Sequence, residues 1–292
     1  MATVTRTWAP PRQGAGRFLR QQLGQQLPKH LLLWLVGFMF FFPFAWLVLT
    51  SLKSAQEIFI FPPTILPQKV EWANYSKAVT AIPFLSYFKN TMVIVIAKIV
   101  GSALSCSVVA YGFSRLEWPG REPLFVLVLA TMMLPYQVTM IPLYIIFDRI
   151  DWIGTYYPLI IPSWFASAYF VFMLRQFFRT IPPELSEAAR IDGCSEPRIY
   201  WQIILPLAQP ALATLVLFQF MGTWNDFFGP LLYINDPKYW TLALGLLQFR
   251  SSHEVAWEQL MAASTLITIP SVILYFIGQK TFIQGIATTG FK

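Results

Sequence analysis

The sequence has little charge and few of the side chains that bind metals or form disulfides. Only 12% of its 292 residues are charged, whereas roughly 25% is usual in soluble domains. So few charges could not cover the surface that a soluble fold of this length exposes to water. Two cysteines and two histidines are also too few for a disulfide framework or a metal cage, and we predict neither. These shortages favour a protein that lies mostly in lipid.

Long apolar stretches take the place of the missing charge. Hydrophobic residues make up 56% of the chain and aromatic residues 17%. Six stretches approach the roughly 20 residues that cross a bilayer as a helix: 31–50, 91–113, 124–147, 157–178, 205–224 and 260–278. The first exceeds the about 7 to 15 residues of a signal-peptide core, so we expect it to be retained. The prediction is an all-α membrane protein with six transmembrane helices.

The basic residues are distributed unevenly between the two sides that six spans create. With both termini inside, the inner segments hold 13 Lys and Arg and the outer loops hold 7. Cytoplasmic loops carry such an excess, so we predict cytoplasmic N- and C-termini. The net charge of +7 then reflects topology, and we expect no nucleic-acid partner. The expected organisation is a basic tail over 1–30, a transmembrane domain over 31–284 and a second tail over 285–292.

Ionisable side chains are scarce within the expected spans. All fourteen carboxylates fall in loops or at span edges, and Asp226 comes nearest to the interior. This distribution argues against an ion-coupled carrier, which uses intramembrane carboxylates. Lys98 lies about two turns inside the second span, where it either extends to the interface or faces a wet cavity. We favour a structural role, because a single cation without a visible partner makes a poor relay.

The longest expected cytoplasmic connection spans residues 179–206, here called the 179–206 loop. Pro182 and Pro183 suit a helix entrance, and acidic Glu184 favours the positive end of the helix dipole. Gly193 suits a left-handed C-terminal cap. The spacing predicts two short helices around that glycine, the second beginning at Ser195, and one narrow apolar strip on the first helix, made of Leu185, Ala188 and Ala189. By itself this pattern equally fits a surface helix tucked against the bundle.

The order of residues in this loop resembles a known family signature. It reads Glu187-Ala-Ala, three residues, Gly193, nine residues, Ile203, one residue, Leu205-Pro206. This order is similar to the loop of permease subunits from binding-protein-dependent ABC importers. Segments along most of the chain, such as 222–227 and 282–285, resemble the second, smaller permease of maltose-type sugar importers. Pro197 departs from the pattern, because a bulkier residue is expected there.

The resemblance implies that the 179–206 loop is a coupling helix seated on a separate ATP-binding subunit. It assigns ATPase coupling to nine residues: Leu185, Glu187, Ala188, Ala189, Asp192, Gly193, Ile203, Leu205 and Pro206. The chain has no G-x-x-x-x-G-K-[ST] phosphate loop, so we expect a transport subunit that is not itself an enzyme, holds no cofactor and leaves ATP and Mg²⁺ to its partners.

The resemblance also implies an assembly in a bacterial or archaeal cell membrane, the inner membrane where there are two. Its other members are a second permease subunit, two ATP-binding subunits and an extracytoplasmic solute-binding protein. That protein is expected to dock on the long outer segments 53–89 and 225–259.

A sugar path needs aromatic faces for C–H groups and amides or hydroxyls for the sugar hydroxyls. Candidates are Tyr136, Gln137, Gln219, Trp224 and Asn225, although aromatics near span ends also serve as interface anchors. Two alternatives stay open: a permease for a non-sugar solute such as glycerol phosphate, and a membrane-embedded transferase acting on lipid-linked sugars. The transferase is disfavoured, since no paired carboxylates of the D-x-D kind stand in a loop.

Overall fold

A computed structural model of the chain describes the backbone of residues 15–250 and 255–289, and the side chains of 27–250 and 255–279. Over these ranges the secondary structure is helical, with one isolated bridge between Arg250 and Val255. The prediction of an all-α protein is therefore confirmed. The longer helices are α1 (Ala15–Ser51), α3 (Ala73–Ala81), α4 (Phe84–Arg115), α5 (Arg121–Thr131), α6 (Tyr136–Arg149), α8 (Ala168–Thr180), α9 (Pro183–Ile191), α12 (Gln209–Trp224) and α15 (Trp257–Thr289).

Short elements connect these helices. They are α2 (Ala55–Ile58), α7 (Tyr157–Ile160), η1 (Ile161–Phe165), α10 (Glu196–Ile199), η2 (Tyr200–Ile204), α11 (Leu205–Leu207), α13 (Phe228–Tyr233), η3 (Pro237–Tyr239), α14 (Leu242–Gly245) and η4 (Leu246–Phe249). All ten are 3 to 6 residues long. Several of them turn the chain at the ends of the bundle, whereas α7 and η1 lead into α8, and α10, η2 and α11 lead into α12.

Four segments of the described chain are long and apolar enough to cross a membrane as they stand: Leu27–Ser51, Phe84–Arg115, Tyr157–Thr180 and Trp257–Gln279. Two further candidates are bent pairs, Arg121–Thr131 with Tyr136–Arg149 at 93° and Glu196–Leu207 with Gln209–Trp224 at 76°. The described residues thus hold four to six candidate spans. Each of the six apolar stretches predicted from the sequence overlaps one of them.

Two of the expected spans are broken by proline. The stretch 124–147 is divided between α5 and α6, and Pro135 stands in extended conformation directly before α6. Proline disfavours the helical conformation of the residue before it, so α5 cannot run on into α6. The stretch 205–224 is divided at Ala208, and Pro210 stands in the first turn of α12. The sequence gives the apolar lengths of these spans, while the bends are a property of the fold.

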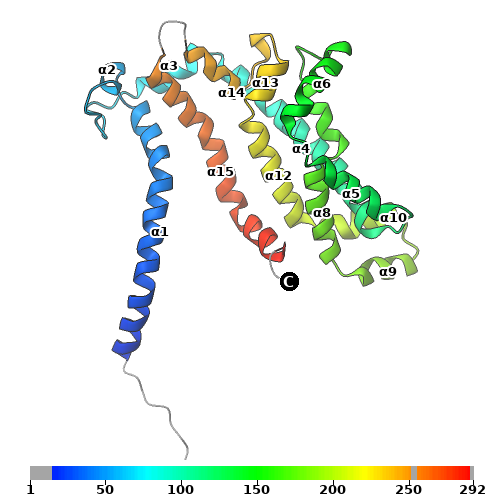
Figure 1. Cartoon of the computed structure of the whole chain (residues 1–292). Helices are drawn as coiled ribbons and strands as arrows, with labels where there is room; N and C mark the ends of the chain where they lie inside the picture. The colour runs from blue at the N-terminus through cyan, green and yellow to red at the C-terminus, as the bar shows by residue number, and fades with distance from the viewer. Residues whose placement is uncertain (1–14, 251–254, 290–292) are drawn as a thin grey trace, which may run out of the picture.

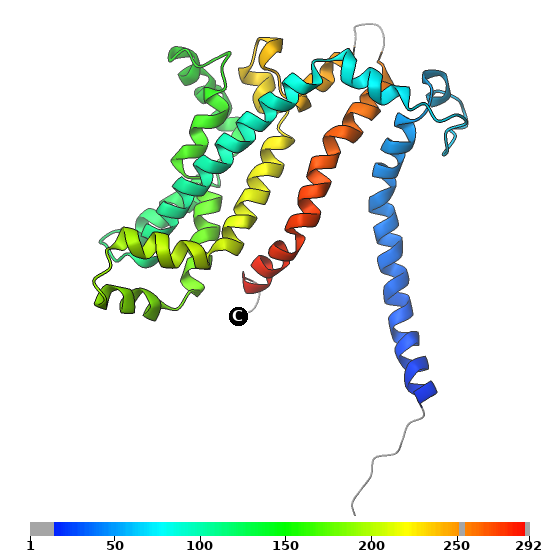
Figure 2. The same ribbon diagram turned by 180° about the vertical axis from the view of Figure 1, so that it is seen from behind.

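Helices α4, α8, α12 and α15 lie side by side and form the body of the molecule (Figure 1). Seen from behind, α4 crosses the bundle from α3 at one end toward α9 and α10 at the other (Figure 2). Elements α2, α3, α13 and α14 gather at the first end, and α9 and α10 at the second. The start of α1 and the C-terminal end of α15 lie toward the α9 end.

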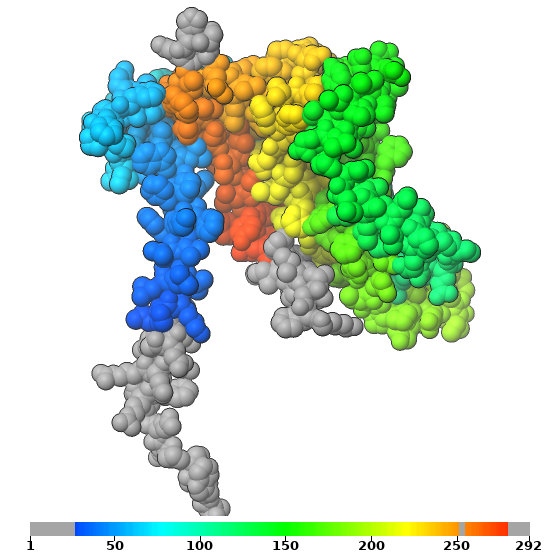
Figure 3. Space-filling model, in the orientation of Figure 1, coloured from blue at the N-terminus to red at the C-terminus, as the bar shows by residue number. Residues whose placement is uncertain are grey.

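Helix α1 stands apart from this body as a separate column (Figure 3). Its side chains from 27 to 43 are all exposed, and it meets α15 only toward its C-terminal end. There Asn74 Nδ2 donates to the carbonyl oxygens of Ser51 and Lys53, at 2.9 and 2.8 Å. Part of the expected N-terminal tail, 15–30, is helical and continuous with this first span, while residues 1–14 lie outside the described chain. The expected C-terminal tail likewise continues α15 to Thr289, and 290–292 lie outside.

The largest apolar core lies near the α9 end. It joins α4, α8 and α12 to the α9–α11 segment through fully buried side chains that include Leu174, Phe178, Ile199, Ile204 and Leu215. The 179–206 loop is therefore packed into the transmembrane body at both ends instead of hanging free.

Candidate functional site

Helix α9 forms where the sequence predicts it. Pro182 is its N-cap residue and Pro183 its first residue, so neither removes an amide hydrogen that the helix needs. At the other end Gly193 has φ +78°, in the left-handed region. The Cys194 amide donates to the Ala189 carbonyl at 2.9 Å, and the Gly193 amide donates to the Arg190 carbonyl at 3.0 Å. These two bonds form a Schellman motif, which confirms the predicted glycine cap.

The expected apolar strip of α9 is divided between two faces. Leu185 is 43% exposed, and Glu187 and Ala188 are exposed as well. Ala189 is instead buried in the core of its own chain, beside the buried Ser186. The face of α9 that remains free for a partner therefore presents a leucine, a carboxylate and one alanine. The remaining residues of the signature are spread more widely. Asp192 is exposed at the helix end, Ile203 and Leu205 are half-buried against the core, and Pro206 is exposed.

A polar contact fastens the α9 segment to α4, and the sequence does not reveal it. Arg190 Nε donates to Glu196 Oε1 at 2.7 Å, and the Tyr111 hydroxyl of α4 donates to Glu196 Oε2. The hydrogen bond from Arg190, followed by that from Tyr111, lowers the pKa of the Glu196 carboxyl. Arg115 Nη2 adds bonds of 2.6 and 2.5 Å to the carbonyl oxygens of Phe178 and Ile181, directly before α9. The segment that contains α9 is thus attached to α4 by side-chain contacts as well as through the chain.

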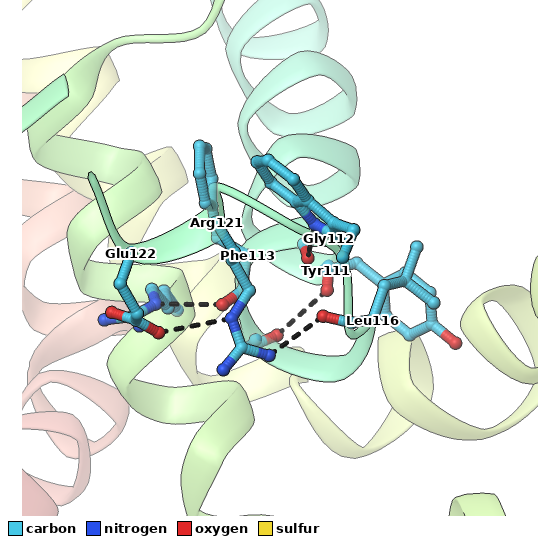
Figure 4. Close-up of polar contacts among 9 residues, drawn as sticks. Tyr111, Gly112, Phe113, Leu116, Arg121 and Glu122 are labelled. Atoms are coloured by element: carbon cyan, nitrogen blue, oxygen red, sulfur yellow. Dashed lines mark hydrogen bonds and ion pairs between the residues drawn. The ribbon is translucent and has the colours of Figure 1, made fainter. Parts of the chain in front are cut away.

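A second polar group holds α4, α5 and α8 together beside this contact (Figure 4). Arg175 of α8 is buried, and its Nη2 lies 2.8 and 2.9 Å from the two oxygens of Glu122. Its Nε donates to the Phe113 carbonyl at 3.0 Å, and its guanidinium carbon lies 3.8 Å from the centre of the Phe125 ring. Arg121 donates to the Leu116 carbonyl at 2.9 Å. The turn between α4 and α5 is therefore rigidly attached to α8.

A cavity of about 870 Å³, here called the main cavity, lies between α4, α6, η1, α12 and α13. Its lining is mixed: polar side chains line it together with the rings of Phe147 and Phe228. The polar side chains are Lys98, Ser102, Tyr136, Gln137, Ser163, Ser167, Gln219, Asp226 and Tyr233. Such a lining of hydroxyls, amides and aromatic faces suits a solute that has both C–H and O–H surfaces.

The structure brings three of the five predicted path residues together. Tyr136, Gln137 and Gln219 line this main cavity, while Trp224 and Asn225 line a separate one of about 420 Å³. Trp224 is 1% exposed, and its Nε1 donates to the Ile267 carbonyl at 2.9 Å. Its ring is thereby held in the helix packing between α12 and α15, away from the main cavity.

The predicted path residues do not include two charged residues that line the main cavity. Lys98 and Asp226 both line it, and the ammonium and the carboxylate interact electrostatically. Both carried a signal, since Lys98 is the lone cation within a span and Asp226 the carboxylate nearest to the interior. Neither signal says that the two side chains face one space, because that depends on how α12 packs against α4. Within the described ranges, no cluster of three or more His, Cys, Asp or Glu side chains offers a metal site.

Named proteins from other organisms are similar in sequence to this chain over most of its length. It is 32% identical to the arabinooligosaccharides transport system permease protein AraQ of Halalkalibacterium halodurans over 260 residues, 88% of this chain and 93% of AraQ. It is 30% identical over 266 residues to the diacetylchitobiose uptake system permease protein NgcG of Streptomyces coelicolor, covering 90% of this chain and 88% of NgcG.

The fold matches a solved transporter. A chain in the crystal structure of a bacterial ABC transporter involved in the import of the acidic polysaccharide alginate superposes with a TM-score of 0.79. The match covers 93% of this chain and 99% of that one, at 20% identity. The binding-protein-dependent transport system inner membrane component family matches residues 101–288, a range that holds α9 and the loop signature. The chain is a multi-pass membrane protein and belongs to this family of ABC transporter permease components.

Proposed function

We propose that the chain is one of two different permease subunits of an ATP-driven importer, and that it forms half of the path for a sugar. Its relatives AraQ and NgcG are designated permeases for arabinooligosaccharides and diacetylchitobiose. The other members of the assembly are a companion permease, two ATP-binding subunits that hold ATP and Mg²⁺, and a solute-binding protein outside the membrane. Family membership removes the membrane-embedded transferase as an alternative.

In this proposal the chain crosses the membrane six times, with both ends in the cytoplasm. The bent pair α5 with α6 serves as one span, and α11 with α12, over 205–224, serves as another, so that α10 and Glu196 stay in the cytoplasmic 179–206 loop. The start of α1, the end of α15 and α9 lie toward one end of the bundle, which fits a common cytoplasmic side. The basic residues of 1–30 support the same orientation.

The observation that carries the proposal is α9, a short helix exposed on one face and fixed to the body on the other. Leu185 serves as an apolar anchor for the groove of the ATP-binding subunit, and Glu187 pairs there with a basic side chain or a helix N-terminus. ATP-driven closure of that subunit pushes α9. The push reaches α4 through Glu196 and Tyr111, and reaches α12 through Ile203 to Pro206.

The outer end of the molecule docks the solute-binding protein in this proposal. The segment that contains α2 exposes large apolar side chains, among them Phe59, Phe61 and Trp72, and Phe61 is 93% exposed. Glu57 orders the same segment, because its carboxylate accepts hydrogen bonds from Thr64 and from the Gln68 amide. An ordered apolar surface of this kind suits a protein partner.

A phosphorylated polyol is the second candidate solute, because the Lys98 ammonium in the main cavity offers a partner for a phosphate. The two candidates differ in solute but share the assembly and the coupling mechanism. The coupling mechanism can therefore be tested before the solute is known.

Charge reversal on α9 tests the coupling. In the Glu187→Lys variant we expect the ATP-binding subunit to copurify at less than half of the wild-type level and ATP-driven uptake into proteoliposomes to fall by about tenfold. The control is Asp148→Lys, another exposed carboxylate, in the last turn of α6 at the opposite end of the bundle from α9 (Figure 1). Unchanged copurification and uptake in Glu187→Lys would sink the assignment of α9.

A further inference from the structure

The main cavity holds two opposite charges that do not neutralise each other in an ion pair. In the part of the chain with described side chains, no ion pair within 4.0 Å joins Lys98 to Asp226. Both side chains line the same 870 Å³ space, and their charges interact across it. A charge within a transmembrane bundle is costly unless a partner satisfies it, and it marks a functional site by default. A ligand that forms hydrogen bonds with both the ammonium and the carboxylate would offset this cost.

Asp226 is held in place so that part of its carboxylate faces the cavity. Its Oδ1 accepts a hydrogen bond from the Gly229 amide at 2.9 Å. A Cβ atom on Gly229 would lie 2.7 Å from Oδ2 and 3.0 Å from a methyl group of Leu159, so only glycine permits this approach. The carboxylate is therefore a preoriented acceptor. Such preorientation lowers the cost of ordering the site when a ligand binds.

Hydroxyl and aromatic groups surround the two charges. The Tyr233 hydroxyl interacts electrostatically with Tyr136 and with Asp226, and the rings of Tyr136 and Phe228 meet edge to face, 6.2 Å apart. Gln219, which also lines the cavity, is fixed at both ends of its amide, by Ser102 at 3.2 Å and by Thr223 at 3.1 Å. The cavity thus offers apolar ring surface and several ordered polar groups around one positive and one negative charge.

We propose that Lys98 and Asp226 together form the solute subsite of this subunit, and that the subsite selects neutral polyhydroxylated solutes over anionic ones. A hydroxyl group accepts a hydrogen bond from the Lys98 ammonium, and the same or a neighbouring hydroxyl donates to the Asp226 carboxylate. One sugar with adjacent hydroxyls therefore satisfies both charges. A phosphate or carboxylate satisfies only Lys98 and is repelled by Asp226. The inference rests on the proposed function as an importer and decides between its two candidate solutes.

The test uses the complete transporter in proteoliposomes, together with its solute-binding protein. Four radiolabelled probes are offered: arabinobiose, diacetylchitobiose and maltose as neutral sugars, and sn-glycerol 3-phosphate as an anion. Equilibrium binding of each probe to the purified transporter without the binding protein is measured alongside uptake. We expect wild type to import at least one neutral sugar and to bind it at least tenfold more tightly than the anion.

Four variants examine the two charges. Lys98→Met and Asp226→Asn should each weaken binding of the neutral sugar by about tenfold or more, because each removes a charge-assisted hydrogen bond. Asp226→Asn should also reduce the ratio of the affinity for the neutral sugar to the affinity for sn-glycerol 3-phosphate. Gly229→Ala, which displaces the carboxylate but keeps its charge, should weaken neutral-sugar binding as well. The charge exchange Lys98→Asp with Asp226→Lys should restore at least a third of the lost uptake.

A matched control is Met92→Leu, which changes an apolar residue of α4 outside the main cavity at nearly constant volume and should leave binding unchanged. Copurification of the ATP-binding subunit identifies any variant that does not assemble. If Lys98→Met does not assemble, Lys98→Arg is measured in its place. Because Lys98→Arg keeps the positive charge, we expect it to bind the neutral sugar nearly as tightly as wild type. Wild-type affinity in Asp226→Asn and Gly229→Ala, or preferential import of sn-glycerol 3-phosphate by wild type, overturns the subsite. If the transporter takes up none of the four probes in the presence of ATP, the sugar-import proposal itself is overturned.

Discussion

At the residue scale, Gly193 sets the end of α9. Its φ of +78° costs an L-residue about 1 kcal/mol or more, and nothing lies within 4 Å of the position that a Cβ would occupy. The cost of a substitution there is consequently backbone strain and not a steric clash. This separates the role of Gly193 from that of Gly229, where a Cβ meets other atoms.

We predict that Gly193→Ala frays the C-terminal turn of α9. Amide hydrogen exchange of residues 189–194 should become about fivefold faster, as expected for a loss of about 1 kcal/mol in local stability. The comparison variant is Gly112→Ala in α4, which also has open space around its Cβ but stands within a regular helix. In the Gly112→Ala variant, hydrogen exchange of α9 should not change. Equal exchange in the two variants would contradict the Schellman assignment.

Glu196 predicts how the attachment of α9 responds to pH. The pKa of the Glu196 carboxyl is lower in the folded protein than its ordinary value of about 4.3. Its contribution to the stability of the α9 attachment is therefore complete above about pH 4.3 and is lost as the pH falls through the lower pKa of the folded state. Intrinsically corrected hydrogen exchange of α9 should therefore be constant between about pH 6 and 8 and rise only below about pH 4. The Glu196→Gln variant should lack this acid-dependent rise. The pair is partly exposed, so we expect an effect of about 0.2–1 kcal/mol.

At the scale of elements, Arg175 connects three helices and should matter more than its neighbours on α8. The Arg175→Met variant leaves the Phe113 carbonyl without its charged donor, which costs about 1.5–3 kcal/mol. We predict a clear decrease in the thermal unfolding temperature of the purified transporter. Arg179→Met, on the same helix but exposed, provides the control and should change it little. A similar decrease in both variants would contradict this prediction, because it would mean that the loss of a positive charge from α8, and not the loss of the Arg175 contacts, lowers the unfolding temperature.

The division of the expected spans also belongs to this scale. Apolar length predicts that 124–147 and 205–224 lie in the membrane, and proline at 135 and 210 marks where a helix can stop. Helices α5 and α12 pack against α4 and α8. No local pattern in the sequence specifies the bend angles of 93° and 76°. Glycine and proline in the 179–206 loop were more informative, because caps and helix entrances depend on neighbouring residues alone.

At the scale of the whole molecule, orientation in the membrane is open to direct measurement. In a background with Cys106→Ala and Cys194→Ser, we introduce single cysteines by Phe61→Cys and Glu187→Cys, both at exposed positions. A membrane-impermeant maleimide should label the first in right-side-out cells and the second only in inverted vesicles. Labelling of the second from outside would contradict cytoplasmic termini and the coupling role of α9.

The sequence alone determined the helical class, the apolar stretches, the ends of α9 and the family signature, because hydrophobic length, caps and residue order are local properties. Only the tertiary structure decided that Ala189 is buried in its own chain, that Trp224 belongs to the packing of α15, and that Lys98 and Asp226 share one cavity. The physical reason is that a side chain's partners depend on how helices far apart in sequence pack together. Residue patterns within one helix do not contain that information.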